Sequence, residues 1–329
     1  MHCSVNKPLI SIVIPVYGVE AYIEQCARSL FEQTYENIEY IFVNDASPDR
    51  SIDILRNVMS QYPKRESQVI IIDHKTNQGL AHARRDGILA AHGEYIGGCD
   101  SDDWLEKDMC ETMLHMAVDG DYDIVLSDMS CYSIDSTDYS LILCHCRDIS
   151  FLLNGILLGD ISACIPSCIF RRSLLDGGII FPQFDMGEDI VLSVQLIDRT
   201  KKIGFVEHPF YHYRCHLGSI STTKNLVFTI NRSRGYHSNM DVVFQYLAKR
   251  KIDSQYYDEI VFRKHIVKSS LCPFLYDNEA YKLWKSIYPE LMYEVWNNKR
   301  IKFWVKCLYL LIWFGIYPCY LRLKRIALL

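Results

Sequence analysis

Residues 93–104 read Gly-Glu-Tyr-Ile-Gly-Gly-Cys-Asp-Ser-Asp-Asp-Trp, a mostly apolar run followed at once by three carboxylates. The run from Tyr95 to Cys99 is typical of a short buried strand, and strands that are apolar throughout belong to parallel sheets. Ligands of open α/β sheets bind beyond the carboxyl ends of the strands. The sequence therefore predicts a ligand site at the acids that follow this strand, Asp100, Asp102 and Asp103.

Three carboxylates at one sheet edge repel one another unless a cation lies among them. Oxygen ligands of this kind suit Mg²⁺ or Mn²⁺, which proteins usually share with a substrate phosphate. A second interpretation is a solvated acidic turn that caps a helix beginning near Trp104, because Asp is a favoured N-cap residue.

Composition narrows the class of protein. A chain of 329 residues with 49% hydrophobic residues is long enough for one large domain, or for one domain with a smaller appendage. The net charge of −5 argues against a general nucleic-acid binder. Thirteen cysteines without a preceding signal peptide favour a reducing cytosol over disulfides. Cys144-His145-Cys146 has no second ligand pair, so structural zinc is disfavoured.

Apolar strand patterns alternate with helical patterns through the first hundred residues, which predicts a parallel, doubly wound sheet. The predicted strands cover 9–14, 38–43, 69–72 and 95–99, and the predicted helices cover 22–31, 52–62 and 81–91.

Polar side chains follow each of these strands, where a nucleotide binds in such a sheet. They are Tyr17, Asp45, Asn77 and the acids Asp100 and Asp102. No Gly-x-Gly-x-x-Gly follows the first strand and no Gly-x-x-x-x-Gly-Lys-Ser/Thr occurs, which disfavours a hydride-transfer Rossmann enzyme and a P-loop ATPase. A diphosphate then needs another counterion, and the acidic cluster with a metal can supply one.

Several motifs in order carry a resemblance to a known family. They are Ser11-Ile-Val-Ile-Pro-Val-Tyr17, Phe42-Val-Asn-Asp-Ala-Ser-Pro-Asp49, Asn77-Gln-Gly-Leu-Ala-His-Ala-Arg84, Gly93-Glu-Tyr-Ile with Asp100-Ser-Asp-Asp-Trp104, and Gly187-Glu-Asp189. With them the sequence resembles a family-2 inverting glycosyltransferase of the bacterial surface-polysaccharide type. The resemblance implies an α/β GT-A (Rossmann-like) fold, a mostly parallel sheet with flanking helices, plus a C-terminal helical extension.

The resemblance also implies roles for single residues. Tyr17 would stack on uracil beside Pro15, and Asp45 would accept a hydrogen bond from uracil N3–H. Asp100 would lie near the ribose, and Asp102 would ligate Mg²⁺ or Mn²⁺ bridging the diphosphate. The implied nucleotide-binding set is Pro15, Tyr17, Asp45, Asn77, Gly79, Arg84, Asp100 and Ser101, and the implied metal ligands are Asp102 and Asp100.

Structural interpretations of the same residues remain open. Tyr17 and Pro15 suit an ordinary turn, and Asp45 suits an Asx-turn or a helix cap. Arg84, which the resemblance places near the nucleotide or in the ordering of its loop, suits a surface ion pair. The family often has Asn where this chain has Arg85 and Gly18, so contacts at those two positions are open.

An inverting transfer needs one base, which takes the proton of the acceptor hydroxyl as that hydroxyl attacks the anomeric carbon. By resemblance this base is Asp189, with Glu188 as the alternative, both at the start of a helix that a turn at 184–186 precedes. An alternative is that both acids only stabilise the helix, because negative charges are favourable at the positive N-terminal end of the helix dipole.

Further elements are predicted between the acidic turn and residue 221. They are a helix over 106–118, a strand over 123–126, a variable loop or hairpin over 130–147 and a strand over 163–170. His208, His212 and His216 recur every four residues, but Pro209 and alternating aromatics favour a strand over a helical metal face. Arg214 or His216 is predicted to help hold the diphosphate.

The chain divides into a predicted catalytic region, 1–222, and a helical region, 223–329, that contains two or three amphipathic helices over 226–290. The tail from about 299 to 329 has a different composition, with seven Lys or Arg and no Asp or Glu in the last 35 residues. Its fifteen uncharged residues between Lys306 and Arg322 would span about 22 Å as a helix, short of a hydrocarbon core of about 30 Å, and Pro318 would kink it. An interfacial helix or re-entrant anchor on anionic lipid is favoured over a core helix or an oligomer interface.

These features predict a metal-dependent inverting transferase that moves a sugar from a UDP-sugar to an acceptor saccharide. The acceptor is expected to be a lipid-linked glycan, met by a peripheral enzyme at the cytoplasmic face of the inner membrane. The rivals are a nucleotidyltransferase, which would want a Gly-rich signature near Pro15, and a non-catalytic nucleotide-sugar binder or scaffold, which needs no base.

Overall fold

The computed structural model describes residues 7–132, 139–142, 148–161, 165–215 and 225–326. The strands are β1 Ile10–Val16, β2 Ile38–Asn44, β3 Val69–Asp73, β4 Tyr95–Gly98, β5 Trp104–Leu105, β6 Ile124–Tyr132, β7 Tyr139–Ile142, β8 Cys168–Arg171 and β9 Ile203–Arg214. The α-helices are α1 Ile23–Phe31, α2 Ser51–Met59, α3 Leu80–Ala90, α4 Met109–Gly120, α5 Ile149–Leu158, α6 Glu188–Arg199, α7 Leu226–Arg250, α8 Tyr257–Ser269, α9 Asn278–Ser286, α10 Leu291–Glu294, α11 Phe303–Trp313 and α12 Ile316–Ile326. Short 3₁₀ turns lie at Glu66–Gln68, Arg172–Leu175 and Cys272–Phe274.

A mixed sheet forms the centre of the molecule, with the strand order β3-β2-β1-β4-β8-β6-β9-β5 and β7 paired to β6. Strands β1 to β4 are parallel where they pair, as the alternation of strand and helix patterns predicts. Strand β8 is antiparallel to both β4 and β6, and β9 is parallel to β6. The predicted α/β fold with a mostly parallel sheet and flanking helices is confirmed.

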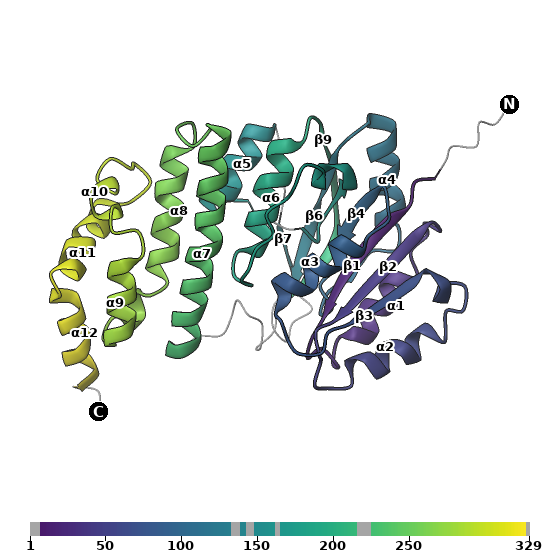
Figure 1. Ribbon diagram of the computed structural model, residues 1–329, viewed down its shortest axis with the longest axis horizontal. Helices are drawn as coiled ribbons and strands as arrows, with labels where there is room; N and C mark the ends of the chain where they lie inside the picture. Colours follow the sequence, from purple (N-terminus) through teal and green to yellow (C-terminus); the bar gives the residue numbers. More distant parts are fainter. Residues whose placement is uncertain (1–6, 133–138, 143–147, 162–164, 216–224, 327–329) are drawn as a thin grey trace.

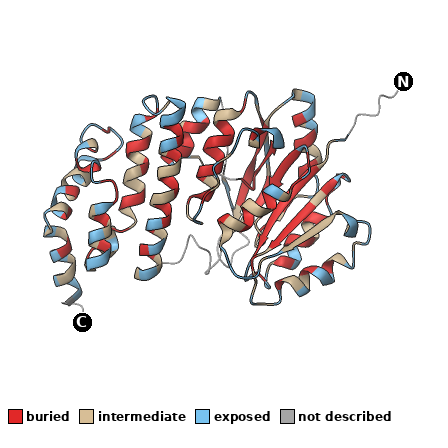
Figure 2. Cartoon of the chain, in the orientation of Figure 1, coloured by how far each residue is buried: buried red, intermediate tan, exposed pale blue. Residues whose placement is uncertain are grey.

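Alternate residues of each strand face two different hydrophobic layers. On β1, Ile12 and Ile14 pack with residues of α1, α2 and α4, whereas Val13 packs with residues of α3, α5 and α6. The sheet is thus covered by helices on both faces, and Figure 2 shows the central strands β1, β2 and β4 largely buried. The polar residues that follow the parallel strands therefore lie at the carboxyl edge of the sheet, where ligands of α/β sheets bind.

The C-terminal helices extend the layer that contains α5 and α6. Helix α7 packs on α6 and α8 packs on α5, and Figure 1 shows α7 to α12 following one another away from the sheet. One continuous hydrophobic cluster runs from Val13 in the sheet to Trp284 and Tyr309 in these helices.

Three predicted elements differ from the structure in their bounds. The helix predicted over 106–118 begins only at Met109, because Trp104 and Leu105 pair with β9 as strand β5. The strand predicted over 123–126 continues to Tyr132 and forms the predicted hairpin with β7. The strand predicted over 163–170 is the shorter β8, and residues 162–164 lie outside the described residues.

The segment around His208 and His212 is strand β9, which confirms the choice of a strand over a helical face of histidines. His216 and the Cys144-His145-Cys146 cluster lie outside the described residues.

The tail breaks at a different residue from the one predicted. Gly315, with φ +78°, ends α11, and Pro318 lies in the first turn of α12, where its missing N–H costs no helical hydrogen bond. No single described helix has the length and apolarity of a membrane span, although α11 and α12 together do and are bent by 82°.

Candidate active site

The carboxyl ends of β1 and β2 bring the first two predicted motifs together. Pro15 is buried in β1 and pairs with Val43, and Tyr17 follows with its side chain 50% exposed. Gly18 has φ +66°, a left-handed conformation that Gly and Asn tolerate best, which accounts for Gly in a place where Asn is also common. Tyr17 is thus exposed at the carboxyl end of β1, where a planar ring can stack on it.

Asp45 organises the loop between β3 and α3. Its Oδ1 accepts from His74 Nδ1 and the Gln78 N–H, and its Oδ2 accepts from the Gly79 N–H, each at 2.8 Å. Because Gly79 is the N-cap of α3, Asp45 caps a helix distant in sequence rather than the one that follows it. Asn77 is exposed on the same loop. The role of Asp45 toward uracil stays a prediction, and the carboxylate is fixed in place for it.

Arg84 lies at the centre of the site. It is 3% exposed, its Nη2 donates to Asp100 Oδ1 at 2.8 Å, and its Nε donates to Glu188 Oε1 at 2.9 Å. Burial disfavours the charged guanidinium, but the carboxylates of Glu188 and Asp100 outweigh it and raise the pKa of Arg84. The interpretation of Arg84 as a surface ion pair is therefore wrong: the residue is a buried cation that joins Asp100 to Glu188, and Glu188 lies 104 positions from Arg84 in the sequence.

Two buried atoms of this ion network have unsatisfied hydrogen-bonding capacity. Arg84 Nη1 and Glu188 Oε2 are buried and have no hydrogen-bond partner among the described residues. An unpaired buried donor is costly, and in native proteins it commonly marks a position where a ligand or water binds.

The three acids after β4 have different environments. Asp103 is 1% exposed; it accepts from Tyr211 Oη at 2.5 Å and from the Arg214 N–H at 2.7 Å. Burial, together with the charges of Asp102 and Asp100, raises the pKa of Asp103 to about 9. Asp103 thus anchors β9 to the acidic turn, and Asp100 and Asp102 are left nearer to the surface.

Strand β9 closes the acidic turn from the other side. Tyr211 Oη accepts from the Asp100 N–H, and Arg214 Nε donates to the Asp102 carbonyl at 3.0 Å. The Arg214 guanidinium lies over the ring of Trp104. Arg214 is therefore held beside the turn, and its predicted contact with a diphosphate is not tested by these bonds.

The acidic turn could supply some, but not all, of the ligands of a hard divalent cation. Asp100 and Asp102 offer carboxylate oxygens, Ser101 is buried between them, and the described residues contain no group of three His, Cys, Asp or Glu side chains placed for one metal ion. Mg²⁺ and Mn²⁺ are commonly held by one or two carboxylates, with substrate phosphates and waters completing the shell.

The second acidic motif lies at the N-terminus of α6. Glu188 is buried against Arg84, and Asp189 beside it is only partly buried. Burial raises the pKa of Glu188 to about 7 against the lowering effect of Arg84. Burial also raises the pKa of Asp189, against the opposing effects of the Ile190 N–H and Arg84.

Helix α7 supports this motif through residues that sequence patterns did not single out. Asn239, 1% exposed, donates to the carbonyls of Phe184 and Met186 in the turn before α6. Tyr236 packs so closely on Gly187 that a Cβ there would lie 2.8 Å from its ring. Neither residue has a sequence signal, because a buried polar residue inside a long helix looks like any surface residue of that helix.

Asp185 joins the turn to α3. Its Oδ1 accepts from the Ala81 N–H at 3.0 Å, so the start of α3 is held by Asp185 as well as by Asp45. The sequence places Asp185 two residues before the second acidic motif, and only the fold brings it to α3.

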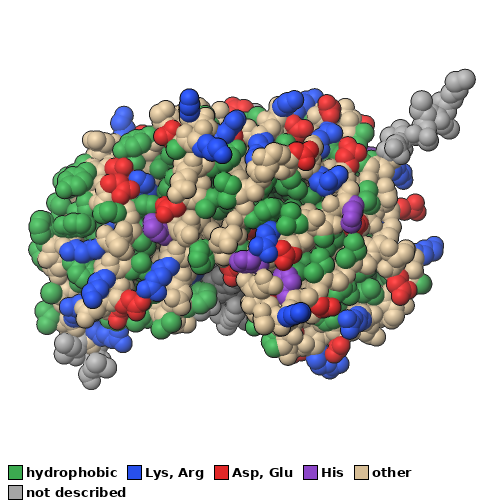
Figure 3. Space-filling model, viewed as in Figure 1, with side chains coloured by type: hydrophobic (Ala, Val, Ile, Leu, Met, Phe, Trp, Pro, Cys, Tyr) green, Lys and Arg blue, Asp and Glu red, His purple; other side chains and the backbone are tan. Residues whose placement is uncertain are grey.

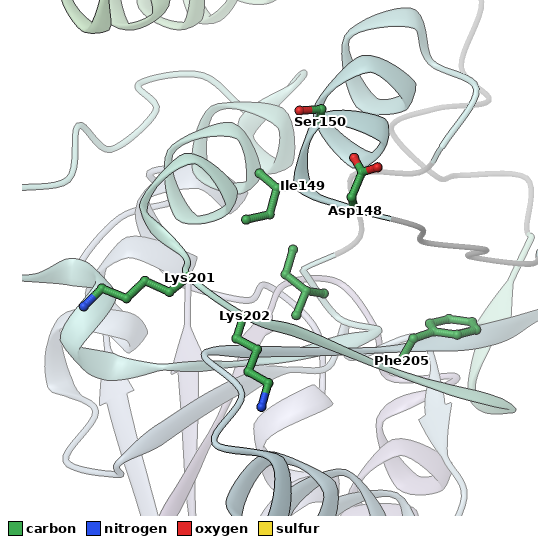
Figure 4. A pocket seen from close by; sticks show the side chains of 7 residues that line it. Asp148, Ile149, Ser150, Lys201, Lys202 and Phe205 are labelled. Atoms are coloured by element: carbon green, nitrogen blue, oxygen red, sulfur yellow. The ribbon is translucent and has the colours of Figure 1, made fainter.

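A cavity of about 450 Å³ opens elsewhere, between the start of α5 and the start of β9. Figure 4 shows Lys201, Lys202 and Phe205 on one side of it and Asp148 on the other. None of the predicted site residues lines it, so it is separate from the site described above.

Comparison with known proteins agrees with this geometry. Residues 11–178 match the sequence profile of glycosyl transferase family 2. The putative glycosyltransferase EpsH of Bacillus subtilis is 36% identical over 223 residues, which are 65% of this chain and 63% of EpsH. The chain thus spans somewhat less than two thirds of that relative.

Two solved structures share the fold at low sequence identity. S. aureus TarS 1-349 in complex with UDP-GlcNAc has a TM-score of 0.59 at 14% identity, covering 97% of this chain and 91% of that one. The mannosyltransferase PcManGT from Pyrobaculum calidifontis, in complex with GDP-Man and Mn²⁺, has a TM-score of 0.51 at 15% identity, covering 97% and 88%. With its sequence motifs, its sheet and its match over residues 11–178, the chain belongs to glycosyl transferase family 2, whose members are glycosyltransferases, here with the GT-A fold.

Proposed function

We propose that this chain is a metal-dependent inverting glycosyltransferase that moves a sugar from a UDP-sugar to a hydroxyl of an acceptor saccharide. The observation that carries the proposal is the buried guanidinium of Arg84, which holds Asp100 at the strand edge and Glu188 on α6. The nucleotide motif and the base motif therefore meet at one point, as a reaction between a bound donor and an activated acceptor requires.

Asp189 is the proposed base. Glu188 is buried with its Oε1 bonded to Arg84, whereas Asp189 is partly exposed and its carboxylate bonds the adjacent Ile190 N–H. A raised pKa makes a carboxylate a stronger proton acceptor for an attacking hydroxyl. Asp189 would take that proton while the sugar bond to the diphosphate breaks on the opposite face of the anomeric carbon.

Tyr17, Asp45 and the acidic turn form the proposed donor site. Tyr17 would stack on the base, and Arg84 Nη1 has a free donor for an anionic group. Mg²⁺ or Mn²⁺ on Asp102 and Asp100 would neutralise charge on the leaving diphosphate. The UDP-sugar complex of TarS supports UDP, and the GDP-Man and Mn²⁺ complex of PcManGT makes GDP the necessary comparison.

The acceptor is proposed to be a lipid-linked glycan of polysaccharide biosynthesis, and the enzyme is proposed to work as a peripheral protein at the cytoplasmic face of the inner membrane. Both proposals are based on the family membership and on the basic, aromatic composition of the tail. Binding to lipid vesicles tests the membrane association directly.

Calorimetric titration of UDP, GDP and dTDP into the full chain, with Mn²⁺ and with chelator, tests the donor site. We expect UDP to bind most tightly and only with the metal. Tighter binding of GDP would change the proposed donor from a UDP-sugar to a GDP-sugar. Absence of nucleotide binding would refute the proposal that the strand ends form the nucleotide site.

Two substitutions separate the base from the metal ligand. Asp189→Asn is expected to reduce transfer about a thousandfold and to leave UDP affinity unchanged. Asp102→Ala is expected to remove the effect of Mn²⁺ on UDP affinity, with the exposed Asp108→Ala as the control. Equal loss of UDP affinity and turnover in Asp189→Asn would remove its role as base, and an unchanged metal response in Asp102→Ala would exclude it as a ligand.

A further inference from the structure

The outer helices carry an exposed apolar surface, here called the α11–α12 face and defined by Phe303, Trp304, Leu311, Phe314, Ile316 and Leu323. Phe303 and Phe314 are each 73% exposed, Leu323 is 67% exposed and Trp304 is 63% exposed. Figure 3 shows hydrophobic side chains along this end of the molecule, with lysines and arginines beside them. Large contiguous apolar surfaces on a protein usually mark an interaction site.

The two faces of α11 differ completely. Phe303, Leu310 and Phe314 recur at helical spacing on the outer face, whereas Tyr309 and Ile312 on the inner face are 1% and 0% exposed. The inner face is anchored by the Tyr309 ring, 5.2 Å from the Trp284 ring. The tail is therefore neither a wholly buried core helix nor a detached one, because one face holds it to the body while the other meets solvent.

The charged residues of the tail itself have a single sign. From Val295 to residue 329 the chain has seven Lys or Arg and no Asp or Glu. Lys302 precedes α11, and Lys324 and Arg325 end α12, all with exposed side chains. Aromatic and aliphatic side chains flanked by basic residues match the apolar interior and the anionic headgroups of a lipid bilayer.

We propose that the α11–α12 face docks in the plane of an anionic lipid bilayer, with Trp304 and Phe314 inserted and the flanking basic residues on the headgroups. This inference deepens the proposed function and rests on it, because it names the surface by which the proposed peripheral enzyme meets the membrane that carries a lipid-linked acceptor. Each helix has eleven residues, about 16 Å, and the 82° bend at Gly315 suits two helices at the interface rather than one across the core.

A second copy of this chain is the other occupant to be considered. An isologous contact through this face would bring two sets of basic residues together without an acid from the same region, which is unfavourable. Charge complementarity thus favours anionic lipid.

Co-sedimentation of the full chain with phosphatidylcholine vesicles, with and without phosphatidylglycerol, tests the proposal. We expect binding to the phosphatidylglycerol vesicles that weakens at high salt. Trp304→Ser with Phe314→Ser should weaken partitioning by about tenfold or more, and Leu89→Ser, at a 64% exposed site on α3, should not.

Each outcome decides one point. Vesicle binding that is absent, or unchanged in the double variant, overturns the proposal. If the chain does not bind vesicles but forms a dimer in solution that Trp304→Ser dissociates, the partner of this face is a second copy of the chain and the lipid proposal is overturned. UDP binding of the same samples, measured without lipid, reports on the donor site independently, so loss of vesicle binding with intact UDP binding refutes only the membrane docking.

Discussion

At the scale of single residues, the three acids after β4 belong to one motif but differ in burial and in their hydrogen-bond partners. Asp103 faces inward and bonds Tyr211 and the Arg214 backbone, while Asp100 faces Arg84. Sequence spacing treats all three carboxylates alike. Their different burial separates the buried Asp103, which anchors β9, from the partly exposed Asp100 and Asp102, whose role toward a ligand stays a proposal.

Asp103 gives stability a pH dependence with a definite sign. Its pKa is about 9 in the folded chain against 3.8 as its ordinary value, so the folded state binds more protons than the unfolded state between these pH values. The free energy of unfolding should therefore fall as pH rises from about 4 to 9, by at most about 1.4 kcal/mol per pH unit. Urea titrations in chelator should show this slope in the wild type and a smaller one in Asp103→Asn; equal slopes would contradict the prediction.

Removal of Arg84 should lower the free energy of unfolding strongly. Arg84→Met leaves Glu188 and Asp100 without their shared cation, and removal of one partner of a buried ion pair costs about 3–5 kcal/mol. Adding Glu188→Gln should restore part of this loss, because the buried carboxylate is then neutral. Denaturant unfolding of the two single variants and the double variant measures the coupling, and strict additivity would argue against the bridge.

At the scale of elements, the turn before α6 is held by two other helices, α3 and α7. Asp185 contacts the start of α3, Asn239 on α7 holds the turn carbonyls, and Tyr236 packs on Gly187. The orientation of the proposed base thus depends on elements that come both before and after it in the chain.

Two glycines with the same backbone conformation allow a matched test of this packing. Gly187 and Gly177 have φ of +78° and +77°, but a Cβ at Gly187 would meet Tyr236 at 2.8 Å, whereas a Cβ at Gly177 would meet nothing within 4 Å. Gly177→Ala should cost about 1 kcal/mol from left-handed strain alone. Gly187→Ala should cost about 1–3 kcal/mol more and should lower turnover as the acidic motif shifts. Equal costs in thermal unfolding would mean that Tyr236 moves freely.

At the scale of the whole molecule, one hydrophobic cluster joins the sheet to the C-terminal helices. The division into regions 1–222 and 223–329 remains a prediction about organisation. The shared core indicates that the two regions depend on each other for stability, and TarS is similar over nearly the whole chain.

We therefore expect cooperative unfolding of the full chain. Trp284 is fully buried within the C-terminal helices, and Trp284→Ala should lower the free energy of unfolding by about 3–5 kcal/mol. Near- and far-ultraviolet circular dichroism should still report one coincident transition. Trp304→Ala, the same substitution on the exposed face, serves as the control and should change stability little. Two separate transitions, with only the second region affected by Trp284→Ala, would establish independent domains.

The sequence alone determined the features that depend on local order along the chain. Strand and helix alternation, the apolar runs and the ordered motifs predicted the sheet, the family and the placement of Tyr17, Asp45 and Asp100 at strand ends, because these follow from periodicity and from the geometry of parallel strands. The tertiary structure alone decided which charges meet. The bridge from Asp100 through Arg84 to Glu188, the burial of Asp103 and the support from Asn239 join residues far apart in sequence, and burial and partner choice arise only when those segments pack.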